Sequence, residues 1–158
     1  MNNGKILAGT IVIVAAIAGI AMYWLQEYAF YSPAVFEPGR EIRLTLIESG
    51  QPEPILAEGI TGIDANSSPL RFRACFKTPL TQAMLTETYK VYEGATPLNG
   101  PSWFDCYDAA EIGTALDQGE AIAFLSEANI VPGFDRVVAV FPDGRAFAWH
   151  QISSAAKE

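Results

Sequence analysis

The sequence predicts an α+β fold in which a small domain follows one N-terminal transmembrane helix. The first observation is a run of twenty residues without a charged side chain, residues 6–25. The second is that about 127 residues follow the aromatic end of this run, a usual size for one domain with its own core. The third is that several segments alternate between apolar and polar residues, which favours a mostly antiparallel sheet of four to six strands accompanied by two helices.

The uncharged run predicts a single-pass membrane anchor. As an α-helix it rises about 1.5 Å per residue and covers roughly the 30 Å of a bilayer's hydrocarbon core. Tyr23 and Trp24 lie at its end, and amphipathic rings of this kind settle at the membrane–water interface. The expected organisation is an N-terminus over residues 1–5, a transmembrane helix over 6–25, a juxtamembrane connector over 26–39 and a domain over 40–158.

Charges beside the run predict its orientation. Lys5 precedes it, Glu27 follows it, and the next basic residue is Arg40. Because the positively charged flank tends to stay in the cytoplasm, the N-terminus is expected inside and the domain outside. The alternative is a cleaved signal peptide, with Gly19 and Ala21 as small residues before the cut. Its apolar stretch is usually about 7–15 residues, so the length of this run favours a retained anchor.

Small residues within the run offer a contact for a second helix. Ala15 and Gly19 lie four residues apart, hence on one helix face, where they let another helix approach closely. The alternative is that Ala and Gly are simply common in membrane helices. No Asp, Glu, Lys, Arg or His lies in residues 6–25, which disfavours a proton or ion path through the helix.

The first half of the domain contains two segments that alternate. Residues 32–39 contain two prolines and a glycine and predict a turn-rich connector. Residues 40–48 alternate as a half-buried strand does, and residues 55–63, with two glycines, predict an irregular strand or loop. In residues 70–77 the alternation is strict, with Cys75 on the face that also carries the basic side chains.

Two helices and a hairpin complete the predicted domain. Thr78 before Pro79 predicts a helix start, and an apolar stripe extends this helix to about Tyr92. Asp108 begins a second helix that ends at Gly119. A strand is expected over residues 121–125. Residues 136–141 and 145–152 flank Pro-Asp-Gly and predict a β-hairpin, with both helices packed on one face of the sheet.

The charge of the domain excludes one class of partner. The chain has 10 basic and 18 acidic residues, and only Lys5 and Glu27 lie before residue 32, so the domain carries the whole net charge of −8. Nucleic acid and anionic headgroups repel such a surface, so no nucleic-acid partner is expected.

Cys75 and Cys106 are the only two cysteines. Outside the cytoplasm such a pair is a candidate disulfide, and closing this loop would stabilise the domain by about 3–4 kcal/mol. Two separate buried thiols are the structural alternative. Thiol–redox exchange is a third interpretation, because Arg71, Arg73 and Lys77 surround Cys75 and would lower the pKa of its thiol.

No catalytic, cofactor-binding or metal-binding residue is predicted. His150 is the only histidine, and two cysteines with one histidine do not complete a zinc site by themselves. Nucleotide-binding glycine motifs and a nucleophile elbow do not occur in the sequence. The chain is therefore expected not to be an enzyme and to need no cofactor.

Large aromatic side chains gather near the predicted turns. Exposed aromatic residues mark interfaces, but in a small β domain they more often fill the core. His150, beside Trp149 on the hairpin, is expected to be a packed or exposed structural residue. The residues kept as candidates for contact with a partner are Ala15, Gly19, Trp103, Phe104, Trp149 and His150.

Five segments carry a resemblance to a family: GKILAGTIVI, LRFRACF, MLTETY, SWFDCYDA and DRVVAVFPDGRAFAWHQI. Together they resemble an uncharacterised family of short, single-pass alphaproteobacterial membrane proteins. The resemblance implies the inner membrane of a Gram-negative bacterium and includes both cysteines in family segments. With the N-terminus inside, as the flanking charges predict, the domain is expected in the periplasm. It implies no activity and no catalytic residue.

Three functions remain open at this point. The first is a non-enzymatic periplasmic domain that binds another envelope protein, as an accessory subunit or assembly factor. The second is a thiol–redox or metal-delivery factor that uses Cys75 and Cys106. The third is a small sensory or ligand-binding domain, which predicts a cavity lined by aromatic side chains.

Overall fold

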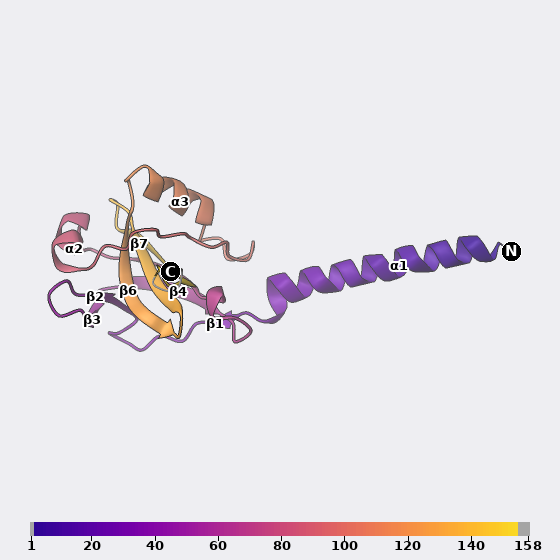
Figure 1. Ribbon diagram of the computed structural model, residues 1–158, viewed down its shortest axis with the longest axis horizontal. Coiled ribbons are helices and arrows are strands. Elements are labelled where there is room, and N and C mark those ends of the chain that lie inside the picture. Colours follow the sequence, from indigo (N-terminus) through magenta and orange to yellow (C-terminus); the bar gives the residue numbers. More distant parts are fainter. Residues whose placement is uncertain (1, 155–158) are drawn as a thin grey trace.

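The computed structural model describes residues 2–154, as a long helix followed by a domain (Figure 1). Helix α1 spans Asn3–Trp24 and continues into one π-helical turn, η1, Leu25–Ala29. None of the α1 side chains is buried. In the described part of the chain this is the one helix long and apolar enough to cross a membrane. A surface this apolar without protein cover fits a bilayer environment.

The domain is built on a six-stranded antiparallel sheet. Its strand order is β1-β4-β5-β8-β7-β6, and every neighbouring pair is antiparallel. This confirms the predicted α+β fold with a mostly antiparallel sheet. The strands are β1 Ser32–Pro33, β4 Glu58–Asp64, β5 Arg73–Lys77, β6 Ile122–Val131, β7 Phe134–Val140 and β8 Arg145–Ile152.

A second, two-stranded sheet pairs β2, Ile42–Thr45, with β3, Pro52–Ile55. The segment after α2 ties it to the large sheet, because the Lys90 N–H donates to the Thr45 carbonyl and the Lys90 carbonyl accepts from the Leu125 N–H. The outer strands β3 and β1 both contain proline, which lacks an N–H donor. Strands β1 and β3 are therefore poorly suited to pairing with a further strand.

The two helices of the domain begin at polar caps. The Thr81 side chain accepts from the Met84 N–H at the start of α2, Gln82–Thr88. The Asp108 carboxylate accepts from two backbone N–H groups at the start of α3, Ala109–Asp117. A short 3₁₀ turn, η2, Pro69–Arg71, precedes β5.

Three expectations about these helices were wrong. Helix α2 begins at Gln82, after the Thr81 cap, rather than after Thr78. Helix α2 ends at Thr88 rather than near Tyr92, because Val91 forms a β-bridge with Phe124 and residues 90–92 therefore join the β structure. The helices also lie on opposite faces of the sheet. Leu85 of α2 belongs to the core shared with β2 and β3, whereas Ile112 of α3 belongs to the core of the other face.

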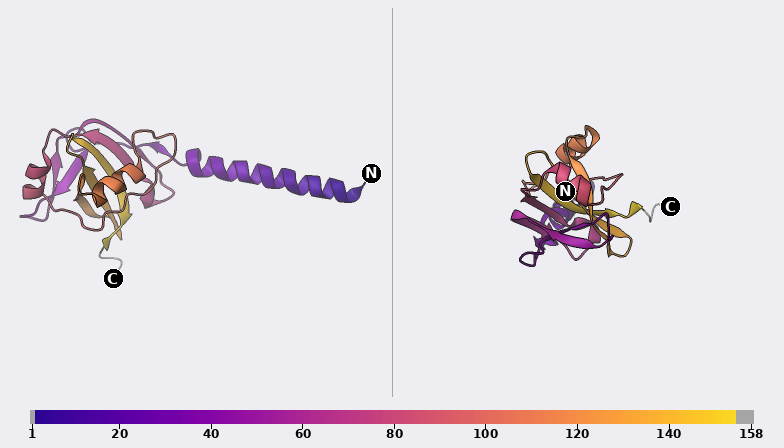
Figure 2. Two further views of the ribbon diagram at one scale, coloured as in Figure 1. Left: turned by 90° about the horizontal axis from the view of Figure 1, so that it is seen from above. Right: turned by 90° about the vertical axis from the view of Figure 1, so that its left-hand side faces the viewer.

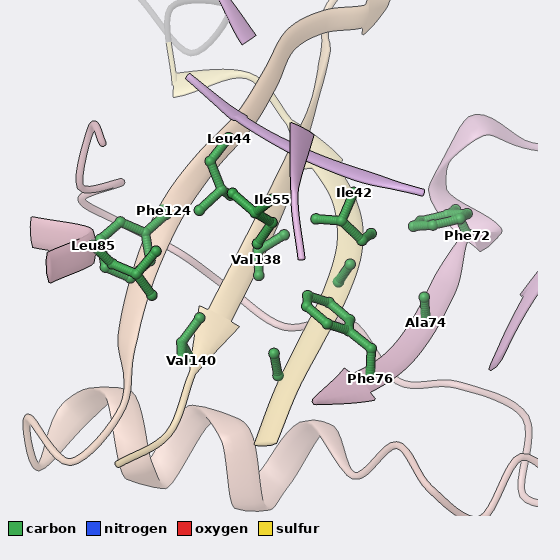
Figure 3. Packing of buried hydrophobic residues seen from close by; sticks show 12 residues of the cluster. Ile42, Leu44, Ile55, Phe72, Ala74, Phe76, Leu85, Phe124, Val138 and Val140 are labelled. Atoms are coloured by element: carbon green, nitrogen blue, oxygen red, sulfur yellow. The ribbon is translucent and has the colours of Figure 1, made fainter. Parts of the chain in front are cut away.

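Both faces of the large sheet are covered. Side chains alternate along β7 and β8, so that Val138 and Ala148 enter one core and Val137 and Trp149 the other. Figure 3 shows the first core, where side chains of β2 and β3 lie beside those of β6 and β7. The domain thus has three layers, with the sheet between two hydrophobic cores.

Turns in the last third of the chain match the predicted hairpin. Strands β7 and β8 are joined through Pro142, Asp143 and Gly144, and Gly144 has a positive φ of 87° that glycine adopts without strain. The predicted irregular strand is β4, whose register shifts between Glu58 and Thr61. Figure 2 shows α1 leaving from one end of the domain.

Candidate functional site

One site suggested by the structure is the junction between α1 and the domain. The Glu27 carboxylate, in η1, accepts hydrogen bonds from the Ser102 N–H at 2.9 Å and from the Ser102 hydroxyl at 3.1 Å. The Glu27 carbonyl accepts from the Trp103 indole N–H at 2.5 Å. These contacts join residues that are 75 or 76 positions apart in the sequence, and they hold the η1 turn at the end of α1 against a loop of the domain.

Aromatic rings surround this junction. The Trp103 ring stacks on Tyr28, with centroids 6.3 Å apart, and meets Tyr31 edge-on at 5.8 Å. The Arg71 guanidinium lies 5.3 Å above the Tyr31 ring and donates to the Gln26 carbonyl at 3.3 Å. We call Tyr28, Tyr31, Arg71 and the loop over residues 98–104 the collar.

A buried arginine of the domain holds the loop of the collar through hydrogen bonds. Arg73 is 3% exposed, and its guanidinium donates to the carbonyls of Leu98 at 2.9 Å and Asn99 at 2.8 Å. It also donates to the carbonyls of Leu70 and Phe72, which precede it. Burial lowers the pKa of Arg73, but an arginine remains protonated at neutral pH. Four carbonyl acceptors thus offset the desolvation of this charge.

A tyrosine completes the surroundings of the buried charge. The Arg73 guanidinium lies 5.5 Å from the centroid of the Tyr107 ring, within range of a cation–π interaction. Tyr107 is buried, and its hydroxyl has no hydrogen-bond partner among residues 2–154. Burial raises the pKa of this phenol, so it stays protonated.

The same loop region is also held covalently. Cys75 of β5 and Cys106 form a disulfide with their Cα atoms 6.3 Å apart, which confirms the predicted pair. Cys75 and Arg73 are two residues apart and lie on the same face of β5. One strand therefore holds the loop at two points, at residues 98–99 through hydrogen bonds and at residue 106 through a covalent bond.

A cavity of about 350 Å³ opens beside the disulfide. Cys75 and Cys106 line it together with Lys77 and Arg145, and the Thr61 hydroxyl lies 3.8 Å from the Cys106 sulfur. Two of the nine residues that line the cavity are aromatic, Phe76 and Phe147. Glu58 also lines the cavity, and Arg145 forms ion pairs with Glu111 and Asp143, so the cavity is a mixed apolar and charged recess rather than an aromatic pocket.

Trp149 and His150, two of the residues predicted to contact a partner, lie in the interior of the domain. Trp149 is fully buried, and its indole donates to the Gln151 side chain at 3.0 Å. The His150 ring stacks on Phe72, with centroids 4.6 Å apart. Buried side chains have no surface to offer a partner, so neither residue enters the proposals below.

The hydrogen bonds of His150 define its protonation state. Its Nε2 accepts from the Arg136 Nε at 3.0 Å, so the proton lies on Nδ1, which donates to the Pro69 carbonyl at 2.7 Å. Burial, reinforced by the charge of Arg136, lowers the pKa of His150 to about 4. The ring is therefore neutral at pH 7 and serves as a packed acceptor.

The other contact candidates are exposed, apart from Phe104, which is half-buried against the core that contains Ile112. Trp103 and Phe104 belong to the loop at the junction. No pattern in the sequence indicated that Glu27 would bond Ser102 and Trp103 or that Arg73 would hold this loop at Leu98. Ala15 and Gly19 lie on the exposed helix α1. Contact between any of these residues and a partner stays a prediction. Within residues 2–154, no group of three or more His, Cys, Asp or Glu side chains is placed to hold a metal ion.

His150 predicts a pH dependence of stability. Its pKa is about 6.5 in the unfolded chain and about 4 in the folded domain. Between these values the unfolded state binds a proton that the folded state does not, so the free energy of unfolding decreases as the pH falls through this window. The loss is at most about 3 kcal/mol. Chemical denaturation of the full chain in detergent, at several pH values across the window, measures it.

The matched control is His150→Gln, whose amide oxygen retains an acceptor for Arg136. This variant should lack the histidine component, so its stability should depend less steeply on pH than that of the unaltered chain. Equal slopes for the two proteins would contradict the assignment.

Comparison with known proteins supplies a family but no activity. A family model described as a family of unknown function (DUF6446) matches residues 42–158. No curated protein and no solved structure matches the chain. The matched residues include β2 to β8, both helices of the domain and both cysteines, and they begin after α1. Because the match covers more than half of the chain, this protein belongs to DUF6446, a family of unknown function.

Proposed function

We propose that this chain is a non-catalytic, membrane-anchored domain that binds another protein of the bacterial envelope, as an accessory subunit or assembly factor. The observation that carries the proposal is a group of exposed apolar side chains at the end of the domain farthest from α1. The collar gives this end a defined direction relative to the membrane helix.

The exposed group consists of Ile47, Met84 and Val91, which we call the distal patch. These side chains are 51%, 55% and 50% exposed, respectively. The Ile47 N–H donates to the Thr88 carbonyl, one helical turn after Met84, which brings Ile47 to the end of α2. Val91 follows Thr88 by three residues. Helix α2, which contains Met84, and strands β2 and β3, whose connection contains Ile47, lie at the opposite end of the molecule from the N-terminus (Figure 1). Exposed apolar side chains brought together in this way are typical of protein interfaces.

The membrane helix offers a second surface. A Cβ atom added at Gly19 would meet no other group within 4 Å. Ala15 lies one turn earlier on the same face, and small residues at this spacing let a second helix pack closely. Helix and distal patch together allow one partner to be contacted in the bilayer and above it.

The disulfide supports a periplasmic location. Disulfides persist in oxidising compartments and are rare in the cytoplasm. Cys75 and Cys106 are bridged, and Lys5 before α1 favours a cytoplasmic N-terminus. We therefore place the domain on the periplasmic side of an inner membrane, with α1 retained as its anchor.

Substitution of the distal patch tests the proposal. The variant Ile47→Thr/Met84→Gln/Val91→Thr should lose a stoichiometric partner that co-purifies with the full chain from native membranes in mild detergent, because its apolar contact area is removed. Thermal unfolding establishes that the variant is folded. Quantitative mass spectrometry of the purified material measures the partner.

The control is Val35→Thr, which alters a side chain that is 97% exposed in the connector and outside the distal patch. It should retain the partner, and Gly19→Leu should reduce its recovery if the helix face also binds. Recovery of a lone monomer from native membranes, or equal recovery with all three variants, would overturn the proposal.

Thiol exchange is a second candidate, favoured by the exposure of Cys106 beside a cavity that Lys77 lines. A thiolate of a partner dithiol would attack the Cys106 sulfur, the disulfide bond would break, and Cys75 would leave as a thiolate. The partner's second thiol would then close on the mixed disulfide, leaving this chain reduced and the partner oxidised. Lysine near the leaving sulfur favours its thiolate form.

Thiol titration separates the two candidates. A structural bridge predicts no free thiol in protein alkylated directly from membranes and slow reduction of the folded chain by a small dithiol. Rapid exchange by the folded chain, slowed several-fold in Lys77→Gln, would instead support the redox candidate. Mass spectrometry of the alkylated protein gives the count of free thiols.

A further inference from the structure

We infer that the collar lies in the headgroup layer of the bilayer and docks the membrane-proximal end of the domain on zwitterionic lipid. The inference rests on α1 being embedded in a membrane, which is part of the proposed function, but it requires no protein partner. It assigns a lipid-binding role to Trp103 and the loop over residues 98–104.

The length of the uncharged run gives the depth of the collar in the bilayer. The uncharged run over residues 6–25 accounts for roughly 30 Å, the thickness of the hydrocarbon core. Tyr28 follows three residues later, about 4–5 Å farther along. The headgroup layer on each side is roughly 5–7 Å thick. Because the Trp103 and Tyr28 rings stack with centroids 6.3 Å apart, the depth of the indole differs from that of the phenol by no more than about the thickness of this layer.

The chemistry of the collar suits this layer. Tyr28 is 43% exposed and Trp103 38%, so each ring keeps an accessible face after stacking. Rings with one polar edge are enriched at the level of the headgroups. Trp103 uses its indole N–H to hold Glu27, whose carboxylate is in turn bonded by Ser102. The polar groups of Glu27, Ser102 and Trp103 therefore already have hydrogen-bond partners within the protein and need none from the lipid.

Charge selects the kind of lipid. Glu27 and Arg71, the charged side chains that take part in the contacts between η1 and the domain, balance each other. The remainder of the domain is strongly acidic, because residues from 32 onward carry the whole net charge of −8. Anionic headgroups would repel that surface. The collar therefore fits an uncharged, zwitterionic surface such as phosphatidylcholine or phosphatidylethanolamine.

Tryptophan fluorescence tests the inference directly, because the chain has three tryptophans: Trp24, Trp103 and Trp149. The full chain carrying Trp24→Phe is reconstituted into phosphatidylcholine vesicles with bromine either near the carbonyl end or near the methyl end of the acyl chains. Bromine quenches indoles close to it. Trp149 is fully buried in the domain and supplies an unquenched background.

The expected result is stronger quenching of the Trp24→Phe protein by the shallow bromine than by the deep one. The matched variant Trp24→Phe/Trp103→Phe, which retains Trp149 alone, should lose this quenched component. Replacement of part of the phosphatidylcholine by unbrominated phosphatidylglycerol, at constant bromine content, should weaken the quenching. Quenching that increases with the anionic lipid would overturn the choice of a zwitterionic surface.

The inference fails if the Trp24→Phe protein is quenched no more than the double variant, or if deep bromine quenches it more strongly. The Trp103→Phe protein distinguishes this failure from a failure of the proposed function. It retains Trp24 at the end of α1, so its quenching shows that the anchor is embedded. If Trp24 is quenched and Trp103 is not, the anchor stands and the collar lies above the membrane, where a protein partner would cover it.

Discussion

The arrangement of this molecule depends on one face of strand β5. Arg73 and Cys75, two residues apart, hold the loop that carries Ser102 and Trp103, the first through backbone carbonyls and the second through a disulfide. An arginine buried without acceptors would destabilise the fold by several kcal/mol, and the disulfide constrains the unfolded chain by about 3–4 kcal/mol. Both contributions act on the same loop, which therefore has a defined shape before it meets the helix.

Because this loop is well ordered, α1 can fix the orientation of the domain. Glu27 binds a backbone N–H and a hydroxyl that are already in place, so the end of the helix is held without an ion pair. An anchor joined by a flexible connector would leave the domain free to tumble. In the proposed arrangement the collar loop faces the headgroups and the distal patch faces away from them. Proline in β1 and β3 discourages strand addition at these two edges.

Local signals made much of the fold predictable. Twenty uncharged residues predicted α1, the Pro-Asp-Gly turn predicted the β7–β8 hairpin, and Asp108 predicted the start of α3. Such local signals could not predict contacts between residues that are far apart in the sequence. The apolar stripe that extended α2 to Tyr92 did not show that Val91 pairs with Phe124, and no periodicity indicated that Arg73 would be buried or that Glu27 would meet Ser102. Tertiary pairing overrode local pattern in each case.

Amide hydrogen exchange of the Ser102 segment, measured on the full chain in lipid, tests the central claim that the ordered loop holds the helix. Removing the acceptor in Glu27→Ala should accelerate exchange there, whereas Glu27→Gln, which keeps an oxygen for the Ser102 N–H, should preserve much of the protection. Exchange in the unaltered chain as fast as in Glu27→Ala would show that helix and domain are not joined in this way, and would contradict the account.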